Sequence, residues 1–598
     1  MSHLTNKIIF FCRHTIYIML KKIISTIIFV VMVLQIYYSY AWNIISASYT
    51  MVHALNAPLL LSLLYFYIKR QKLQRTNIKN IPIIKYENTE NNNTKFRTFN
   101  GTMNAKTCPY MGSRGQPFSR NTFAYEHKDV VSAVKVAKTL LYRDTLKEEP
   151  LVNLLGGAWI QFMIHDWFVH KKTDKTKQID NMTFNELEYI TQNDEKMFIN
   201  DTDHWWSGSQ IYGSSKEDAL KLYNQNTGLM NVDNYLPISD KTNMESVGFT
   251  ESLWFGLCML HYIFVLEHNR IVHDLEKIYP KWNGNRLYNQ ARLIVSAMIS
   301  KIHTLEWTTA IIQHPRGAMF QNILFNGILG RNAKKKVPPL MLKTIGTENT
   351  NLLFGIFGNN LAYRDVNFGH SEEFSSVYRM HSLVPDKFVL VNYENNDIIT
   401  EYNIEDTVLK KSKVVNIENR YEDIIYSLMK QKAGKLCLNN FPIALTKVPL
   451  RKTSMTDLAI LDIYRDRERQ VPRYNDFRKS LHLKSIETFE ELTDDITIIE
   501  KLKSVYKNVD EIDLLIGTHA EKHLPGFIFG ETIYTVFDFQ TQRRIECDRF
   551  LTTDFNAKVY TRYGVKKVLN TNFKDIFIHH FPKLTQTLEK CANAFIPL

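Results

Sequence analysis

A tyrosine and a histidine that could take part in oxidation chemistry lie three residues apart, at Tyr378 and His381. The stretch 373–383 that contains them is predicted to be a helix that ends before Pro385, and residues three apart on a helix share a face. A histidine able to ligate a metal would then lie beside an oxidisable phenol. The same pattern fits a core helix whose histidine bonds to the backbone, so the pair alone leaves both interpretations open.

Another histidine lies far upstream. His165 is part of the apolar stretch 151–168, which is also predicted to be helical, and a carboxylate, Asp166, follows it directly. This second stretch favours a functional interpretation of the first.

Mostly helical elements must position these side chains. Helices are predicted over 129–142, 151–168, 252–277, 287–313, 457–468, 486–509 and 540–553. The main strand signal is an alternating, hairpin-like patch formed by 387–393 and 398–407. The fold class expected is therefore mostly α with a small β patch, in one large domain that covers residues 95–598.

The first part of the chain, residues 1–80, differs in character and is expected to associate with a membrane. Residues 23–42 carry no charge and follow basic residues, so this stretch can span a bilayer as an anchor, with a cleaved signal peptide as the alternative. A second apolar stretch, 54–68, is bordered by Lys69, Arg70, Lys72 and Arg75. This pattern suits a helix in the membrane interface with its charges at the headgroups, and a buried core helix is the alternative.

Composition allows a large core and argues against several classes of protein. Of the 598 residues, 44% are hydrophobic and 23% charged, and the low counts of 23 Gly and 17 Pro argue against long disorder. The net charge of +13 comes without a recognisable nucleic-acid module, so we interpret it as basicity that favours anionic membranes or substrates. The six cysteines are scattered, which indicates neither a disulfide framework nor a zinc site.

Six stretches, in order along the chain, resemble the fatty acid α-dioxygenases of the animal haem peroxidase and cyclooxygenase superfamily. They are QFMIHDW (161–167), WWSGSQIYGS (205–214), KIHTLEWT (301–308), VYRMH (377–381), YRDRERQVPRYN (464–475) and RRIECDRF (543–550). The resemblance covers the chain from about residue 95 to its end, and it implies a large helical, haem peroxidase-like domain.

The resemblance implies a particular oxidation. His381 would be the proximal ligand of the iron of haem b. His165 would be the distal histidine, which moves a proton while a peroxide O–O bond breaks. Tyr378 would become a tyrosyl radical that removes a hydrogen from the substrate. Dioxygen would then add to C2 of a long-chain fatty acid, and the 2-hydroperoxide would lose CO2 to leave an aldehyde one carbon shorter.

The same resemblance assigns a binding site for the substrate carboxylate to His303, Thr308 and Arg544. A buried carboxylate needs a cation and hydrogen-bond donors, and an arginine can bind both of its oxygens. Arg544 is preferred over the adjacent Arg543. On an α-helix, residues five apart such as His303 and Thr308 would lie about 140° apart, so only a substrate at the edge of that helix could touch both. Without the resemblance, a core histidine, a helix hydroxyl and a surface arginine would explain these residues.

Calcium is expected next to the distal histidine. The resemblance implies oxygen ligands from Asp166, Asp203, the carbonyl of Trp205, Ser207 and Ser209. In the superfamily this loop carries Thr first and Asp third, whereas here Asp203 is first and Ser207 third. The charge is kept although the geometry changes, and calcium accepts such rearranged oxygen ligands. A cluster of helix-capping residues without a metal is the alternative.

A second departure concerns the distal face. In the superfamily, the segment after Leu-Pro-Ile-Ser at 236–239 carries an arginine that supports peroxidase chemistry. Here the segment reads Asp-Lys-Thr-Asn at 240–243. Either Lys241 substitutes for the arginine or activation by peroxide is weaker.

The function expected is a haem-dependent α-dioxygenase of long-chain fatty acids. Three alternatives remain: a haem peroxidase of small reductants, a dioxygenase that attacks fatty acids in mid-chain, and a non-catalytic haem- or lipid-binding protein. The expected partners are a long-chain fatty acid, dioxygen and a membrane surface, without nucleic acid, and a monomer is expected. The expected location is intracellular, on an endomembrane or the surface of a lipid body.

Overall fold

The computed structural model describes residues 50–86, 95–128, 130–251, 254–448 and 455–598. The predicted anchor at 23–42 lies outside these ranges. Within them, no helix is both long enough and apolar enough to cross a bilayer.

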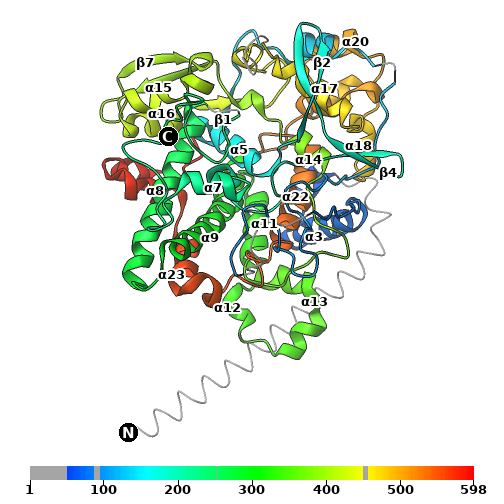
Figure 1. Ribbon diagram of the computed structural model, residues 1–598. Coiled ribbons are helices and arrows are strands. Elements are labelled where there is room, and N and C mark those ends of the chain that lie inside the picture. Colours follow the sequence, from blue (N-terminus) through cyan, green and yellow to red (C-terminus); the bar gives the residue numbers. More distant parts are fainter. Residues whose placement is uncertain (1–49, 87–94, 129, 252–253, 449–454) are drawn as a thin grey trace.

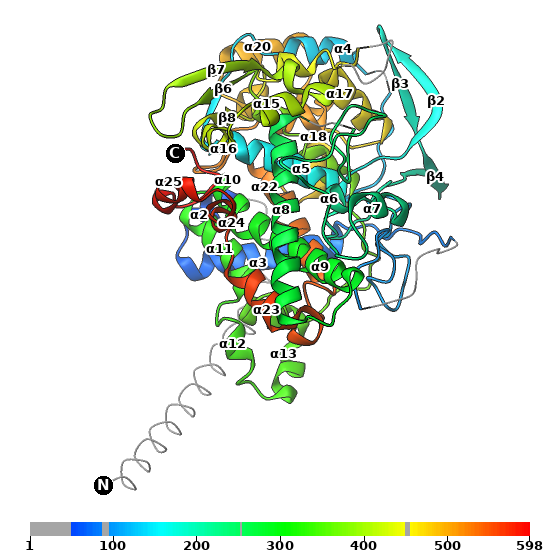
Figure 2. The same ribbon diagram turned by 60° about the vertical axis from the view of Figure 1, so that its left-hand side comes forward.

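Helices make up most of the molecule (Figures 1 and 2), as predicted. The longer helices are α3 (Leu59–Thr76), α5 (Leu154–Trp167), α8 (Phe255–Ile278), α9 (Gly284–Ile302), α11 (Pro315–Asn326), α13 (Pro339–Phe354), α16 (Tyr421–Lys430), α17 (Leu458–Glu468), α20 (Ile496–Val505), α22 (Glu531–Glu546) and α23 (Ala557–Asn570). The shorter ones are α2 (Met51–Asn56), α4 (Ala133–Val136), α6 (Ser209–Tyr212), α7 (Lys216–Leu222), α10 (Thr308–Ile311), α12 (Arg331–Lys334), α14 (Glu372–Val377), α15 (Lys413–Glu418), α18 (Tyr474–Ser480), α19 (Phe489–Leu492), α21 (Leu514–Ala520), α24 (Phe573–His580) and α25 (Thr585–Lys590). Single turns of π-helix form η1 (Ala137–Leu141) and η2 (His303–Trp307), and 3-10 turns form η3 (His381–Leu383), η4 (Ile404–Thr407), η5 (Leu409–Lys411), η6 (Ile443–Leu445), η7 (Val509–Glu511) and η8 (Pro582–Leu584).

Strands form small antiparallel pairs. The pairs are β1 (Glu148–Asn153) with β8 (Lys432–Gly434), β2 (Lys172–Ile179) with β3 (Met182–Leu187), β4 (Tyr189–Gln192) with β5 (Glu195–Phe198), and β6 (Lys387–Val391) with β7 (Ile398–Asn403). The predicted hairpin is therefore present as β6–β7, whereas the other pairs were not predicted. In Figure 1 the β6–β7 and β2–β3 hairpins lie at opposite upper corners of the helical body.

Helix α5 lies near the centre, against α8, and α8 in turn packs along α9 (Figure 2). The side chain of Asn153 begins α5 by accepting the backbone N–H of Gly156 at 3.0 Å, which satisfies a donor that the first turn cannot pair. Nearly every side chain of α5 is buried, so the helix is apolar all round rather than on one face. This position brings both His165 and Asp166 into the interior.

Helix α3 packs against α22, and this contact corrects one expectation. Arg70 forms a buried ion pair with Asp538, and the Lys69 ammonium donates to the Thr535 hydroxyl at 3.2 Å. These two basic residues therefore do not border a membrane, because the second half of α3 belongs to the core. The start of α3 is different: Leu59, Leu60 and Leu61 are 49%, 53% and 41% exposed.

Several helix boundaries differ from the predicted ones. Within 129–142, regular helix begins only at α4, and the stretch 486–509 is divided between α19, α20 and η7. Helix α22 begins nine residues before the predicted 540, and it ends at Glu546 rather than at 553. The most consequential difference is at α14, which ends at Val377. Tyr378 and His381 therefore do not share the face of one continuous helix, as their spacing had suggested.

Candidate functional site

Tyr378 is completely buried among aromatic rings. Its ring stacks on Phe537 with centres 4.3 Å apart, and the ring of Trp167 meets it edge-on at 5.7 Å. Its hydroxyl has no hydrogen-bond partner among the described residues. Burial raises the pKa of the phenol, and Arg544 and Thr541 offset only part of that increase. The phenol is therefore neutral at physiological pH.

Arg544 is a buried cation that lies on two indoles. Its guanidinium carbon is 3.3 Å from the centre of the Trp167 ring and 4.2 Å from that of Trp206. In the described part of the chain, none of its three guanidinium nitrogens has a hydrogen-bond partner. Burial lowers the pKa of Arg544 to about 9. An unpaired buried charge is costly, so this arrangement suits an anionic ligand.

The adjacent arginine has a different task. Arg543 donates to the backbone carbonyls of Tyr363 and Val366 at 3.0 and 2.9 Å, and thereby holds the segment before α14. The preference for Arg544 as the carboxylate ligand remains a prediction, and it is consistent with these contacts.

His303 presents one hydrogen-bond donor to the same space. Its Nδ1 accepts the indole N–H of Trp159 at 3.2 Å, so in the neutral ring the proton is on Nε2. That Nε2 has no partner within the described ranges. Burial, and then the charge of Arg544, hold the pKa of His303 well below its usual value. A neutral imidazole that offers an N–H is the result.

Thr308 is brought next to His303 by an irregular turn. Residues 303–307 form the π-turn η2, in which the N–H of Thr308 bonds to the carbonyl of His303. A π-turn has more residues per turn than an α-helix, so these two residues lie closer around the axis than the 140° expected for an α-helix. The Thr308 hydroxyl donates to the same carbonyl at 2.8 Å, and it must rotate to donate to a ligand.

Trp167 is the common neighbour of the three central groups. Its ring contacts Tyr378, lies under Arg544 and meets His303 edge-on at 5.2 Å. Helix α22 supplies the opposite wall, since Phe537 and Arg544 are seven residues apart and so lie on one face. A phenol, a guanidinium and an imidazole N–H therefore converge on one enclosed region.

His381 begins the short turn η3 and keeps 31% of its side chain exposed. Its Nδ1 is 2.8 Å from a carboxylate oxygen of Asp462, on α17. Burial would raise the pKa of Asp462, but Arg379 and His381 hold it below its usual value, so this carboxylate accepts the Nδ1 proton. The other nitrogen, Nε2, is then available as a metal ligand, which fits an axial ligand of haem.

A row of buried ion pairs fixes the segment that carries Tyr378 and His381. Glu372 accepts from Arg469 at 2.9 Å, Arg469 also pairs with Asp466, and Arg379 pairs with Asp462. Two of these residues flank Tyr378 in sequence, and the other three lie on α17 or directly after it. The row ties the region around α14 to α17, while Tyr378 points away toward α22.

His165 is buried near the end of α5. Its ring centre is 4.3 Å from that of Phe249, and its Nδ1 has no partner in the described ranges. Burial lowers the pKa of His165 to about 3, so the ring is neutral. Lys241, which was considered as a substitute for the missing arginine, is exposed.

The predicted calcium ligands lie together. One oxygen of Asp166 accepts the backbone N–H and the hydroxyl of Ser209, at 2.6 and 2.8 Å. One oxygen of Asp203 accepts from the Trp205 backbone at 2.9 Å and the Ser207 hydroxyl at 2.8 Å. The second oxygen of each carboxylate is buried without a partner among the described residues. Burial and then the nearby Asp166 raise the pKa of Asp203 to about 8.

Two residues of this region were not singled out from the sequence. Asp462 interrupts the apolar run 458–463, and a carboxylate in such a run signals a buried partner. Trp167 was part of a quoted motif, but no role was given to it. Nothing in the sequence pattern distinguishes an indole that supports a cation from one that fills the core.

Comparisons with known proteins agree with this geometry. A family model described as animal haem peroxidase matches residues 96–192 and 174–594. The chain belongs to the animal haem peroxidase family. The alpha-dioxygenase 2 of Arabidopsis thaliana is 32% identical to it, over 90% of each chain.

Solved structures show the same relationship. The fatty acid α-dioxygenase of Arabidopsis thaliana superimposes with a TM-score of 0.84 at 29% identity, over 90% of this chain and 89% of that one. A variant of the Oryza sativa enzyme, solved with palmitic acid, gives 0.84 at 28% identity over 95% and 97%. The predicted helical, haem peroxidase-like fold and the predicted likeness to fatty acid α-dioxygenases are confirmed.

Proposed function

We propose that this protein is a haem-dependent α-dioxygenase that adds dioxygen to C2 of long-chain fatty acids. One observation carries the proposal: the guanidinium of Arg544, without an acceptor among the described residues, and the buried phenol of Tyr378 lie against the same indole, that of Trp167. A fatty acid whose carboxylate pairs with Arg544 has its C2 close to that carboxylate by covalent structure. The C2–H bonds are therefore the ones presented to Tyr378.

The binding step needs little rearrangement of the chain. Arg544 and the Nε2–H of His303 donate to the two carboxylate oxygens, and Thr308 adds a third donor once its hydroxyl rotates. The indole of Trp167 and the other rings exclude water, which strengthens each of these contacts.

The chemical step runs through Tyr378. His381 would hold the haem, which when bound would supply the one-electron oxidation of this phenol. The tyrosyl radical takes a hydrogen atom from C2, and dioxygen adds to the carbon radical. The peroxyl radical recovers a hydrogen atom from the Tyr378 hydroxyl, which restores the tyrosyl radical. The 2-hydroperoxide can then lose CO2 and water to give an aldehyde one carbon shorter.

Calcium fits the acidic pair next to the distal histidine. Two buried carboxylates with one unpaired oxygen each, in the described part of the chain, lie against the hydroxyls of Ser207 and Ser209. Oxygen ligands of this kind suit Ca²⁺. We propose that Asp166, Asp203, Ser207, Ser209 and the Trp205 carbonyl hold the ion.

We further propose that the enzyme works as a monomer at an intracellular membrane or lipid-body surface. The exposed Leu59, Leu60 and Leu61 and the net charge of +13 support a contact with an anionic lipid surface. A hydrophobic substrate would be drawn from that surface.

The burial of Arg544 in the same aromatic cluster as Tyr378 argues against a dioxygenase that attacks fatty acids in mid-chain. Oxidation far from the carboxylate would require the cation at a distance from the phenol. A peroxidase of small reductants would have no use for a buried cation with an open set of donors.

The test is oxygen uptake by the haem-loaded protein given palmitic acid, with products identified by mass spectrometry. We expect the 2-hydroperoxide or the aldehyde one carbon shorter. The Tyr378→Phe variant should lose oxygen uptake and keep the haem spectrum. A mid-chain hydroperoxide, or a Tyr378→Phe variant that still consumes oxygen with palmitic acid, would overturn the proposal.

A further inference from the structure

Trp159, on α5, is completely buried and has one polar atom, its indole nitrogen. Its ring packs against four phenylalanine rings whose centres lie 5.1–5.9 Å away, those of Phe162, Phe264, Phe573 and Phe595. These side chains contain no hydrogen-bond acceptor, and a buried indole N–H needs one. The acceptor is Nδ1 of His303, at 3.2 Å. Turning the indole away from it would leave the N–H facing hydrocarbon rings.

The C-terminal segment of the chain holds both partners of this hydrogen bond. The ring of Phe573 packs on that of Trp159, and the backbone N–H of Phe573 donates to the Glu306 carboxylate at 2.9 Å. Glu306 belongs to η2, the turn that His303 begins. The side-chain amide of Asn593 donates to the Glu306 carbonyl at 2.8 Å. The indole and the turn that carries its acceptor are therefore held by the same segment.

This hydrogen bond determines what His303 offers to a ligand. A neutral imidazole has one N–H and one acceptor nitrogen, so with Nδ1 accepting from Trp159 the donor is Nε2. The ring of His303 lies 5.2 Å from Trp167 and 5.7 Å from Trp206, the two indoles that Arg544 covers. The Nε2–H and the guanidinium therefore present donors alone to one region.

We propose that Trp159 is a positioning residue that determines specificity: by keeping His303 a donor, it restricts the site to a headgroup with two acceptor oxygens, a carboxylate, and excludes the carboxamide of the same shape. This inference rests on the proposed function, because it takes the carboxylate site from it. Trp159 acts through His303 and does not itself touch the ligand.

The exclusion follows from the hydrogen-bonding groups of a primary amide, which presents one acceptor oxygen and one NH2 donor. If its oxygen pairs with Arg544, its NH2 meets the Nε2–H of His303. If the imidazole reverses its tautomer to accept from the NH2, its Nδ1–H meets the N–H of Trp159. Either arrangement leaves buried donors without an acceptor, which weakens binding.

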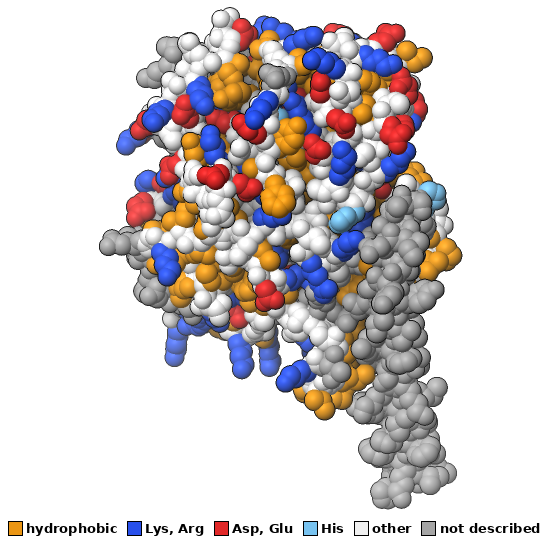
Figure 3. Space-filling view, turned by 90° about the vertical axis from the view of Figure 1, so that its right-hand side faces the viewer, with side chains coloured by type: hydrophobic (Ala, Val, Ile, Leu, Met, Phe, Trp, Pro, Cys, Tyr) orange, Lys and Arg blue, Asp and Glu red, His pale blue; other side chains and the backbone are white. Residues whose placement is uncertain are grey.

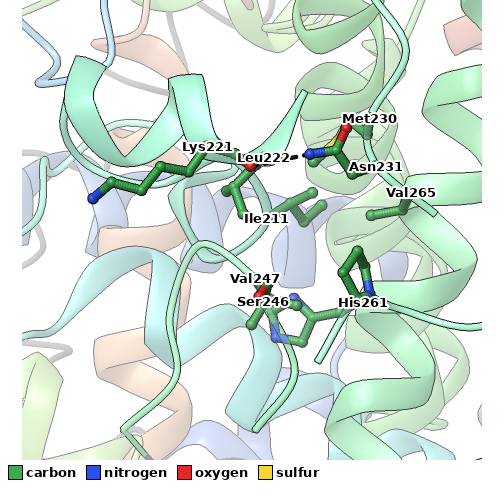
Figure 4. A pocket seen from close by; sticks show the side chains of 10 residues that line it. Ile211, Lys221, Leu222, Met230, Asn231, Ser246, Val247, His261 and Val265 are labelled. Atoms are coloured by element: carbon green, nitrogen blue, oxygen red, sulfur yellow. Dashed lines mark hydrogen bonds between the residues drawn. The ribbon is translucent and has the colours of Figure 1, made fainter. Parts of the chain in front are cut away.

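Figure 4 shows a separate cavity beside α8. Its lining includes Met230, His261 and Val265, but neither Trp159 nor His303. Its volume is about 70 Å³, which is room for a few water molecules. A fatty acid or a fatty amide is too large for it, so binding of either ligand reports on another site.

Equilibrium dialysis of the haem-loaded full chain against dodecanoic acid and dodecanamide, with dioxygen excluded, tests the inference without turnover. We expect the wild type to bind the acid about 100-fold or more tightly than the amide. In Trp159→Phe the imidazole is free to reverse its tautomer, so the Kd of the amide should fall about tenfold. The Kd of the acid should change by less than about threefold, because Nε2 can still carry the proton. General loosening of the site would instead weaken both ligands.

Trp307→Phe is the matched control. Trp307 is as buried as Trp159, and its ring stacks on that of His303 with centres 4.8 Å apart, but its N–H donates to the Gly156 carbonyl at 2.9 Å. This variant also removes an indole N–H next to His303, yet it leaves the bond to Nδ1 in place. Its preference for the acid over the amide should equal that of the wild type.

The outcomes separate this inference from the proposed function. A folded Trp159→Phe variant that rejects the amide as strongly as the wild type overturns the inference, even if the wild type oxygenates palmitic acid. Equal gains in amide binding by Trp159→Phe and Trp307→Phe also overturn it. A gain in Trp159→Phe alone, with no oxygen uptake by the wild type given palmitic acid, supports the inference and rejects the proposed function.

A second replacement decides if Trp159→Phe does not fold. The amino acid 3-benzothienylalanine has the shape of tryptophan and carries sulfur in place of the indole N–H. With it at position 159, tighter binding of dodecanamide supports the inference, and unchanged binding overturns it.

Discussion

At the scale of single residues, the site is defined by groups that the protein leaves unsatisfied. Among the described residues, Arg544, the Nε2 of His303 and the hydroxyl of Tyr378 are all buried without a partner. A buried polar group without a partner calls for an explanation, such as a ligand. These three groups surround the indole of Trp167, and together they suit a ligand that carries a carboxylate and a C–H bond next to it.

The charge of Arg544 gives a pH dependence with a definite sign. Burial lowers its pKa to about 9, so the guanidinium is charged at neutral pH and loses its proton as the pH rises through that value. The fatty-acid carboxylate is already ionised above about pH 5. We expect kcat/KM for palmitic acid to fall as the pH rises through about 9, because kcat/KM reports groups of the free enzyme. Oxygen-uptake kinetics measure this, with circular dichroism to show that the fold persists. A flat profile at higher pH would contradict the assignment.

Replacing Arg544 should weaken substrate use far more than replacing its neighbour. Arg544→Gln removes the only cation assigned to the carboxylate, and a lost buried charge pair is worth about 3–5 kcal/mol, or a fall in kcat/KM of about 10² to 10⁴. Arg543→Gln is the control, since Arg543 bonds to backbone carbonyls. That variant should lose stability but keep its KM. Equal KM values for the two variants would count against the role of Arg544.

Removing a proposed calcium ligand should remove the response to the ion. In the wild-type protein, calcium at about 100 times its Kd should stabilise the fold by about 2.7 kcal/mol, which raises the melting temperature relative to a chelator. Asp203→Asn should abolish that difference. Asp201→Asn, which changes a partly exposed carboxylate paired with Arg114, should retain it. A chelator without effect on the wild type would argue for a cluster of capping bonds without metal.

At the scale of the elements, α14 and α17 act as one unit. The positions of Tyr378 and His381 follow from ion pairs on either side of them rather than from helical periodicity. This explains why the sequence identifies the two residues but misplaces their geometry: α14 ends at Val377, and Arg379 is held by Asp462 on a distant helix.

The ion pairs between these helices should be strongly coupled. Arg469→Met removes the guanidinium that pairs with the buried carboxylates of Glu372 and Asp466, which are left with His170 and with the more distant Arg379. Breaking buried ion pairs of this kind is strongly destabilising, so we expect a loss of about 3–5 kcal/mol in the free energy of unfolding. Glu372→Gln alone should also destabilise. The double variant should lose less than the sum of the two, because the residues are in contact. Urea denaturation followed by circular dichroism measures all three, and additive losses would show that the pairs do not act together.

Two other elements show which local structures could be predicted from the sequence and which could not. The β4–β5 hairpin carries a usable signal, since Asn193 and Asp194 both have positive φ and form a turn suited to a tight hairpin. The π-turn η2 carries none, because the apolar pattern of 287–313 fits a continuous α-helix equally well. The motifs therefore identified His303 and Thr308 as site residues. The π-turn that brings them closer together has one residue more than a turn of α-helix, and only the backbone of the structure shows it.

At the scale of the whole molecule, charge and apolar surface are unevenly placed. On the face in Figure 3, basic and acidic side chains alternate over the upper part, whereas acidic ones become sparse toward the lower end. The start of α3 exposes three consecutive leucines on a molecule whose net charge is +13. Both features suit a protein that meets an anionic lipid surface.

Replacing those leucines should weaken membrane binding. About half of each side chain is exposed, so insertion of all three is worth about 3 kcal/mol, or a change of about 100-fold in partitioning. We expect the triple variant Leu59→Ser, Leu60→Ser, Leu61→Ser to lose binding to anionic vesicles by about that factor in a flotation assay. Leu340→Ser is the control, because Leu340 is 78% exposed on a different helix. Equal losses in both variants would mean that α3 is not the contact.

The last turn of α5 limits how this protein can diversify. His165, Asp166 and Trp167 are consecutive, so their side chains leave the helix about 100° apart and reach three different regions. A substitution that adapts one of them to a new task moves the backbone on which the other two depend. Selection for altered chain length or reactivity, in nature or in the laboratory, should therefore leave this turn unchanged. New variants would instead accumulate in the surrounding walls, such as at Phe249, whose ring lies against that of His165.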